Sequence, residues 1–167
     1  MEDHCADCGF DQSTAPADRI AAALSNVASA VAQSMRLLAP DTTRHRPGPD
    51  VWAPVEYLGH LRESMAFHRW LVERALAEEC PTIATVDPNA SVADADYLTA
   101  DVEDLISQFH RRIDRLAARV IALDEAAMPR KALLGDREIT VGLIARSAWH
   151  ECHHHLGDIR RIGGLGL

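Results

Sequence analysis

Apolar residues recur at steps of three and four along four long stretches of the chain, a spacing that gathers them on one face of an α-helix. The two-residue alternation that is typical of half-buried strands is nowhere convincing. The sequence therefore predicts an all-α protein, an up-down four-helix bundle. The predicted helices cover residues 16–38, 54–79, 100–123 and 141–162.

The segments between the predicted helices are rich in proline, glycine and aspartate, which favour turns and loops. We expect loops over residues 40–49 and 81–99, and an irregular crossing segment over residues 123–138. In a bundle, a long loop often covers the mouth of a pocket. The candidates for substrate contact in the second loop are Asp87, Asp94, Asp96 and Tyr97.

Length and charge narrow the classes of function. A chain of 167 residues is most simply one domain with its own core, here predicted over residues 16–163, after a short N-terminal extension over residues 1–15. The net charge of −8 argues against a nucleic-acid partner, because phosphate binding needs a basic patch. The sequence shows neither a basic and apolar leader nor a run of about 18 apolar residues. We therefore expect a cytoplasmic protein that does not enter a membrane.

Two of the four cysteines form a Cys-x-x-Cys-Gly motif in the extension, at Cys5 and Cys8. Two thiolates at this spacing can share one tetrahedral metal ion, as in half of a zinc ribbon. The second half is missing, so a closed site would need His4, a histidine from elsewhere in the chain, or a second chain. A structural metal site, a redox-active pair and a plain tail all remain open interpretations.

Residues 148–159 hold four of the nine histidines together with a glutamate and a cysteine, which points to metal binding. Apolar residues at helical spacing flank this run, so we place it on the fourth helix. Side chains four residues apart lie on one helix face. Two ligand pairs fulfil this condition, His150 with His154 and Glu151 with His155.

The two pairs point in different directions. His155 falls in the middle of the apolar stripe, with Glu151 about 40° to one side, whereas His150 and His154 lie about 100–140° away on a side that looks solvated. A glutamate in an apolar stripe is costly unless it is paired or coordinated. The pattern therefore favours Glu151 and His155 as ligands, with His150 and His154 as the less favoured alternative. The simplest competing interpretation is a metal-free ion pair between Glu151 and His155.

A third ligand is expected from a facing helix, as in other bundle metal sites. His60 lies at the edge of the apolar stripe of the second helix and fits this role, although a single histidine there can also be an ordinary core residue. His68, two turns further along, is a weaker candidate.

The sequence resembles the DinB/YfiT-like metalloprotein family over nearly its whole length. The resemblance rests on Trp52 and His60 in "WAPVEYLGHLRE" and on "HECHHHLGDIRR" near the C-terminus, and "CADCGFD" is similar to a subgroup with such a motif ahead of the bundle. It implies a four-helix bundle that binds a divalent metal through His60, Glu151 and His155. A glutamate and histidine pair is similar to the branch of mycothiol-dependent maleylpyruvate isomerases. We expect no C-terminal second domain of the kind that isomerase carries, and therefore do not expect the isomerase activity itself.

Three protein ligands leave an open coordination position, as in catalytic zinc sites. Zinc is the expected ion, and the donor set also suits nickel or iron. The resemblance implies an enzyme that transfers a low-molecular-weight thiol, such as mycothiol or bacillithiol, to an electrophilic small molecule, or a related hydrolase. Asp158 could orient a ligand, although the simpler interpretation is a solvent-facing side chain. A small-molecule substrate and a homodimer are the expected partners.

Two other classes remain open at this point. One is a non-enzymatic metal-binding, redox-sensing or zinc-sensing protein that uses Cys5 and Cys8. The other is a scaffold that has lost its metal site. Metal content and the effect of His155→Ala distinguish these classes from an enzyme.

Overall fold

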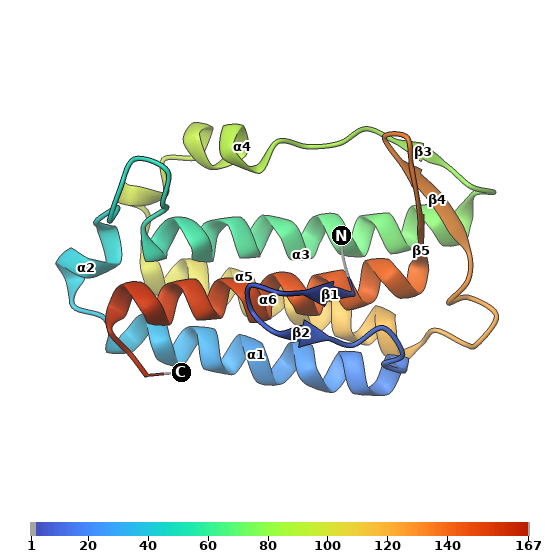
Figure 1. Ribbon diagram of the computed structural model, residues 1–167, viewed down its shortest axis with the longest axis horizontal. Coiled ribbons are helices and arrows are strands. Elements are labelled where there is room, and N and C mark those ends of the chain that lie inside the picture. Colours follow the sequence, from blue (N-terminus) through green and yellow to red (C-terminus); the bar gives the residue numbers. More distant parts are fainter. Residues whose placement is uncertain (1–2, 167) are drawn as a thin grey trace.

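The computed structural model describes residues 3–166, and four long helices form a bundle (Figure 1). Each helix begins and ends within about two residues of its predicted range, so the predicted four-helix bundle is confirmed. No helix within the described residues is both long and apolar enough to cross a membrane. The bundle helices are α1 (Ala17–Leu37), α3 (Pro54–Ala77), α5 (Val102–Ile121) and α6 (Val141–Gly163).

The order of the helices around the bundle differs from the predicted up-down order. α1 packs against α5 and α6, and α3 packs against the same two helices, so that α1 and α3 lie on a diagonal. Helices α3 and α5 run in the same direction, opposite to α1 and α6 (Figure 1). The up-down prediction is wrong because residues 78–101 form a connection that returns along the length of the bundle, whereas a short loop would have made α3 and α5 antiparallel.

Short elements occupy the segments that were predicted as loops. The prediction that strands are absent is also wrong, because strands of two to four residues are too short to show a clear alternation. β3 pairs in parallel with β4, and β4 pairs with β5 in a hairpin whose turn includes Gly135 at φ +63°. These elements are α2 (Pro40–Arg44), β3 (Thr82–Ile83), α4 (Pro88–Asp94), the 3₁₀ helix η1 (Tyr97–Thr99), β4 (Lys131–Leu134) and β5 (Arg137–Thr140).

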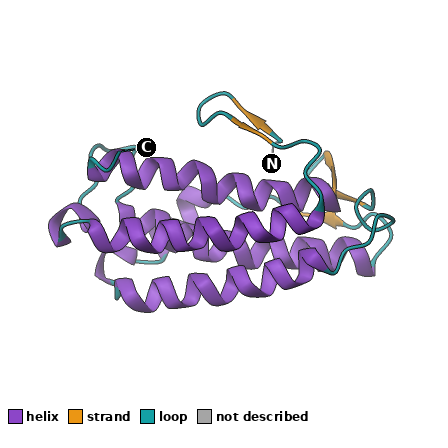
Figure 2. Cartoon of the chain, turned by 90° about the horizontal axis from the view of Figure 1, so that it is seen from below, coloured by secondary structure: helices purple, strands orange, loops and turns teal. Residues whose placement is uncertain are grey.

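The N-terminal extension forms a small antiparallel hairpin of β1 (His4–Cys5) and β2 (Phe10–Asp11), which lies outside the bundle beside α6 (Figure 2). The turn uses Gly9 at φ +70°, a conformation that glycine adopts readily. The first two residues of the predicted extension lie outside the described residues. We call residues 3–11 the N-terminal hairpin.

Two apolar clusters hold the molecule together. The larger one fills the bundle between α1, α3, α5 and α6, with fully buried residues such as Leu24, Leu58 and Phe109. The smaller one joins the end of α3 and the start of α6 to the three-stranded sheet, and Ile83 and Ile139 belong to it. The sheet therefore fixes one end of the connection that returns along α3.

Candidate metal centre

The three predicted ligands meet where α3 and α6 pack side by side. Pro54 begins α3, and the Glu56 carboxylate accepts a hydrogen bond from the Ala53 backbone N–H at 2.9 Å, which fixes the first turn. His60 follows one turn later and faces Glu151 and His155, which lie one turn apart on α6. We call these three side chains the histidine–glutamate group.

The Glu151 carboxylate lies between the two imidazole rings. Its Oε2 atom is 3.2 Å from His60 Nε2 and 3.6 Å from His155 Nε2. One ligand atom from each of the three side chains lies within 4.8 Å of the other two. Such a cluster fits one metal ion after small side-chain rotations, and two imidazoles with one carboxylate form a donor set of catalytic zinc sites.

Asp158 orients the His155 ring through its Nδ1 atom, the nitrogen that faces away from Glu151. The His155 Nδ1–H donates a hydrogen bond to Asp158 Oδ2 at 2.8 Å, and Asp158 Oδ1 accepts one from Arg161 at 2.7 Å. Asp158 is only 9% exposed, so the interpretation as a solvent-facing side chain is wrong. A carboxylate on the outer nitrogen fixes the ring and leaves Nε2 directed at the group, as in many metal-binding histidines.

Two aromatic rings cover the other side of the histidines. The Trp52 ring centroid lies 5.1 Å from that of His60 and 6.2 Å from that of His155, and the Tyr57 ring lies 5.1 Å from His155. The family resemblance singled out Trp52, whereas nothing in the sequence singled out Tyr57, which lies in the same stretch. Together the rings shield the histidines on the side where α3 begins.

The charges in the group suit a cation. Burial opposes charge on Glu151, but hydrogen bonds from His155 and His60 outweigh burial and hold the pKa of this carboxyl well below its usual range. Burial likewise opposes charge on His155, but hydrogen bonds to Asp158 and Glu151 outweigh it and raise the pKa of the ring to about 9. Two carboxylates thus keep a positive charge on His155, and a divalent cation can supply that charge in place of the proton.

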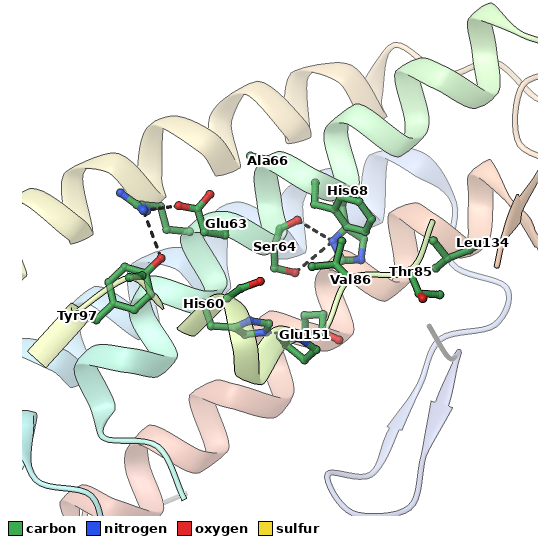
Figure 3. Close-up of a pocket in the computed structure, with 15 residues that line it drawn as sticks. His60, Glu63, Ser64, Ala66, His68, Thr85, Val86, Tyr97, Leu134 and Glu151 are labelled. Atoms are coloured by element: carbon green, nitrogen blue, oxygen red, sulfur yellow. Dashed lines mark hydrogen bonds and ion pairs between the residues drawn. The ribbon is translucent and has the colours of Figure 1, made fainter. Parts of the chain in front are cut away.

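A cavity of about 620 Å³ opens beside the group, and His60 and Glu151 form part of its wall (Figure 3). Its other walls come from α3 and from the returning connection, with Phe67, Val86 and Tyr97 among them. Of the loop residues predicted to contact a substrate, only Tyr97 belongs to the wall among the described residues. The three aspartates lie elsewhere, and Asp87 caps α4.

His68 lies in the cavity wall and is not part of the ligand cluster in the described part of the chain. Its Nδ1–H donates a hydrogen bond to the Ser64 carbonyl oxygen at 2.8 Å, and burial lowers the pKa of the ring, so the ring is neutral. Its Nε2 atom is buried and has no hydrogen-bond partner among residues 3–166. The cavity wall therefore includes a buried imidazole acceptor that no described residue satisfies.

The other pair of histidines on α6, His150 and His154, lies under the N-terminal hairpin. The Nδ1 atom of His154 is 3.7 Å from Cys5 Sγ. The expectation of a solvated side is wrong, because the hairpin covers it. The structure thus places His150 and His154 with Cys5 and Cys8. His154 also lies close to the neighbouring group, since one ligand atom each of His154, His155 and Asp158 lies within 4.8 Å of the other two.

Comparisons with known proteins agree with this fold. A family model described as the DinB superfamily matches residues 23–159. The solved structure of YfiT from Bacillus subtilis is similar with a TM-score of 0.78 and 21% sequence identity, over 90% of this chain and 89% of that one. YfiT is described as a probable metal-dependent hydrolase with an unusual four-helix bundle topology. A comparison with curated proteins gave no match.

Proposed function

The chain belongs to the DinB superfamily, and from this premise we propose that it is a divalent-metal-dependent enzyme acting on a small molecule. The observation that carries the proposal is the convergence of His60, Glu151 and His155 at the wall of a cavity. The description of YfiT as a probable metal-dependent hydrolase supports the same class of activity.

The histidine–glutamate group would hold the ion, with zinc favoured and nickel or iron compatible with the donors. A bound divalent ion supplies Lewis acidity, which lowers the pKa of a water or thiol that serves as the nucleophile. The side chains of the protein prepare this chemistry. Asp158 keeps the His155 ring oriented, and the rings of Trp52 and Tyr57 pack against it.

The cavity suits a substrate that extends along α3. Its wall is mostly apolar, with Ala66, Phe67 and Leu134 among its residues. His68 lies eight residues after His60 on the same helix, which is about 12 Å along the axis. Its free acceptor would therefore bind a hydroxyl, amine or amide N–H on a part of the substrate remote from the reacting atom.

Within this class we propose transfer of a low-molecular-weight thiol such as mycothiol or bacillithiol to an electrophile, or hydrolysis of a small ester or amide. Both reactions need one activated nucleophile beside a cavity that accepts an apolar molecule. The second candidate is a non-enzymatic zinc or redox sensor, and the observation that favours it is the gathering of Cys5 and Cys8 with two histidines.

The test combines metal content with turnover in the tag-free chain. We would measure metal per chain by mass spectrometry. We would screen pairs of a thiol and an electrophile for thiol transfer, and esters and amides for hydrolysis. His155→Ala is expected to lose one metal equivalent and all turnover. The matched control is His45→Ala, because His45 is an exposed histidine that is not part of the group and its removal should change neither measurement.

Two results would overturn the proposal. One is His155→Ala protein that keeps both its metal and its turnover. The other is wild-type protein that binds no divalent ion after incubation with zinc, nickel or iron(II). Turnover that depends on Cys5 and Cys8 but not on His155 would favour a redox reaction of these two cysteines instead.

A further inference from the structure

A second group of potential metal ligands lies between the N-terminal hairpin and α6. One ligand atom from each of its four side chains lies within 4.8 Å of the other three, and Cys5 Sγ is 3.7 Å from His154 Nδ1. Two segments from opposite ends of the sequence therefore contribute one compact group. Its members, which we call the Cys2His2 group, are Cys5, Cys8, His150 and His154.

Contacts that do not involve the two cysteines also hold the hairpin on α6. The buried Phe10 ring packs against Trp149 and His150, with centroid distances of 5.1 Å and 4.9 Å. At the start of the hairpin, Asp3 accepts two hydrogen bonds from the Arg146 guanidinium at 2.6 Å and 2.9 Å. The hairpin is thus placed by its own packing, and the cysteines face α6 as a consequence.

The donor set points to zinc. Two thiolates and two imidazoles, spaced as Cys-x-x-Cys and His-x-x-x-His, are the ligands of closed tetrahedral structural sites. Zinc–sulfur bonds of about 2.3 Å and zinc–nitrogen bonds of about 2.0–2.1 Å place such ligand atoms about 3.3–3.8 Å apart. The group needs to contract by only about 1 Å to reach this geometry, since its atoms already lie within 4.8 Å.

The need for a metal also follows from the size of the hairpin. Each of its strands has two residues, and an isolated two-stranded hairpin is at best marginally stable in water. Yet Cys5 and Phe10 are buried. We propose that the Cys2His2 group binds one zinc ion, which fastens the N-terminal hairpin to α6.

This site is connected to the histidine–glutamate group through Asp158. The Oδ2 atom of Asp158 lies 2.8 Å from His155 Nδ1 and 3.8 Å from His154 Nε2. The Nδ1 atom of His154 faces Cys5, so zinc takes one side of the ring and the carboxylate the other. Zinc at the Cys2His2 group fixes this segment of α6 and with it the position of His155.

The test uses the full chain, purified without a tag under reducing conditions and loaded with zinc or cobalt(II). We expect two metal equivalents in the wild type and, with cobalt, the thiolate charge-transfer and strong d–d bands of a tetrahedral thiolate site. Cys8→Ser should lose one equivalent and these bands. His155→Ala should lose the other equivalent and keep the bands.

Matched controls separate loss of a ligand from loss of folding. Cys80→Ser removes an exposed cysteine and His45→Ala an exposed histidine outside the group, and both should keep two equivalents. Cys8→His should restore the second equivalent with weaker thiolate bands, because imidazole can replace a thiolate in such sites. Thiolate bands that survive Cys8→Ser would overturn the proposal. A Cys5–Cys8 disulfide that persists under reducing conditions in place of bound zinc would also overturn it. The same holds if the wild type binds a single metal equivalent and only His155→Ala loses it.

Discussion

Asp158 contacts one histidine of each of the two groups on α6. Its carboxylate accepts hydrogen bonds from His155 and Arg161, and its Oδ2 atom lies 3.8 Å from Nε2 of His154, one turn earlier on α6. A carboxylate bound to the outer nitrogen of a metal-binding histidine fixes the ring and raises its basicity. In the proposed metal site Asp158 would therefore act on the metal through His155, as a positioning residue.

We expect Asp158→Asn to weaken metal binding at the histidine–glutamate group by about 10–100-fold, as loss of such outer partners does elsewhere. Competition with a chromophoric chelator measures the affinity. The control is Asp114→Asn on the exposed face of α5, which should leave the affinity unchanged. An unchanged affinity in Asp158→Asn would mean that His155 does not need the negative charge of this carboxylate.

His68 offers a different prediction, which concerns substrate and not metal. In His68→Asn the amide can take the place of Nδ1–H at the Ser64 carbonyl, while the acceptor at Nε2 is lost. We expect KM for a substrate found in the screen to rise about 5-fold, since a hydrogen bond contributes about 1 kcal/mol, with kcat and metal content unchanged. Its control is His110→Asn on α5, and a fall in kcat alone would contradict the role in binding.

At the scale of elements, the start of α3 depends on one buried carboxylate. Glu56 is 2% exposed, and its Oε2 atom accepts hydrogen bonds from Arg46 Nε at 2.6 Å and from the Ala53 N–H. Burial favours the neutral acid, but these hydrogen bonds outweigh it and lower the pKa of Glu56. The ion pair thus holds the residues before α3 against the helix that carries His60.

We expect Arg46→Ala to destabilise the protein by about 1–3 kcal/mol at neutral pH, because Glu56 keeps its charge with one partner fewer. A folded-state pKa below that of the unfolded chain gives stability that is present above about pH 4.3 and is lost as the pH falls through the folded value. The destabilisation should therefore shrink below about pH 4. Urea denaturation across pH measures this, and Arg74→Ala in an exposed pair on α3 should have little effect.

A second element-scale contact docks the returning connection on α3. A Cβ atom at Gly59 would lie 2.6 Å from the Tyr97 ring, and Tyr97 is 5% exposed. We expect Gly59→Ala to displace Tyr97 and to cost about 1–3 kcal/mol, as overpacking does. Gly157→Ala, at a helical glycine with open space around it, should stabilise by up to about 1 kcal/mol.

Limited proteolysis reports where the change occurs. Displacement of Tyr97 should make residues 78–101 more sensitive to cleavage in Gly59→Ala and leave Gly157→Ala unaffected. Equal protection of this segment in both variants would show that Tyr97 does not dock it.

Which elements the sequence reveals depends on how many residues repeat a pattern. The four long helices show several turns of apolar spacing and were predicted within about two residues. α4 has seven residues, and β4 and β5 have four each, so their patterns cannot be told from a loop. The pairing of Glu151 with His155 was readable for the same reason, because both lie on a long helix whose apolar face is clear.

At the scale of the whole molecule, the arrangement of the helices was not predictable from their patterns. An apolar stripe requires a partner helix but does not identify it, so α1 is equally compatible with α3 or α6 as a neighbour. The same limit applied to the hairpin. Cys-x-x-Cys and His-x-x-x-His were both visible, but only the fold brings residues 5–8 beside residues 150–154.

The hairpin makes a final prediction about how stability is distributed. Phe10 and Cys5 belong to neither of the two apolar clusters of the described chain, so the bundle core does not depend on them. Removal of zinc from the Cys2His2 group should therefore speed amide exchange in residues 3–11 and in the adjoining part of α6, with little change in α1 and α5. Hydrogen exchange with mass spectrometry measures this in the intact chain.

The comparison that isolates the Cys2His2 group is between wild type and Cys8→Ser, each with zinc and with a chelator. The wild type should lose hairpin protection when the chelator is added, whereas Cys8→Ser should lack that protection under both conditions. Chelation also strips the histidine–glutamate group, and since this happens equally in both proteins, the difference between them belongs to the hairpin. Faster exchange throughout α1 and α5 would instead mean that the hairpin and the bundle unfold as one cooperative unit.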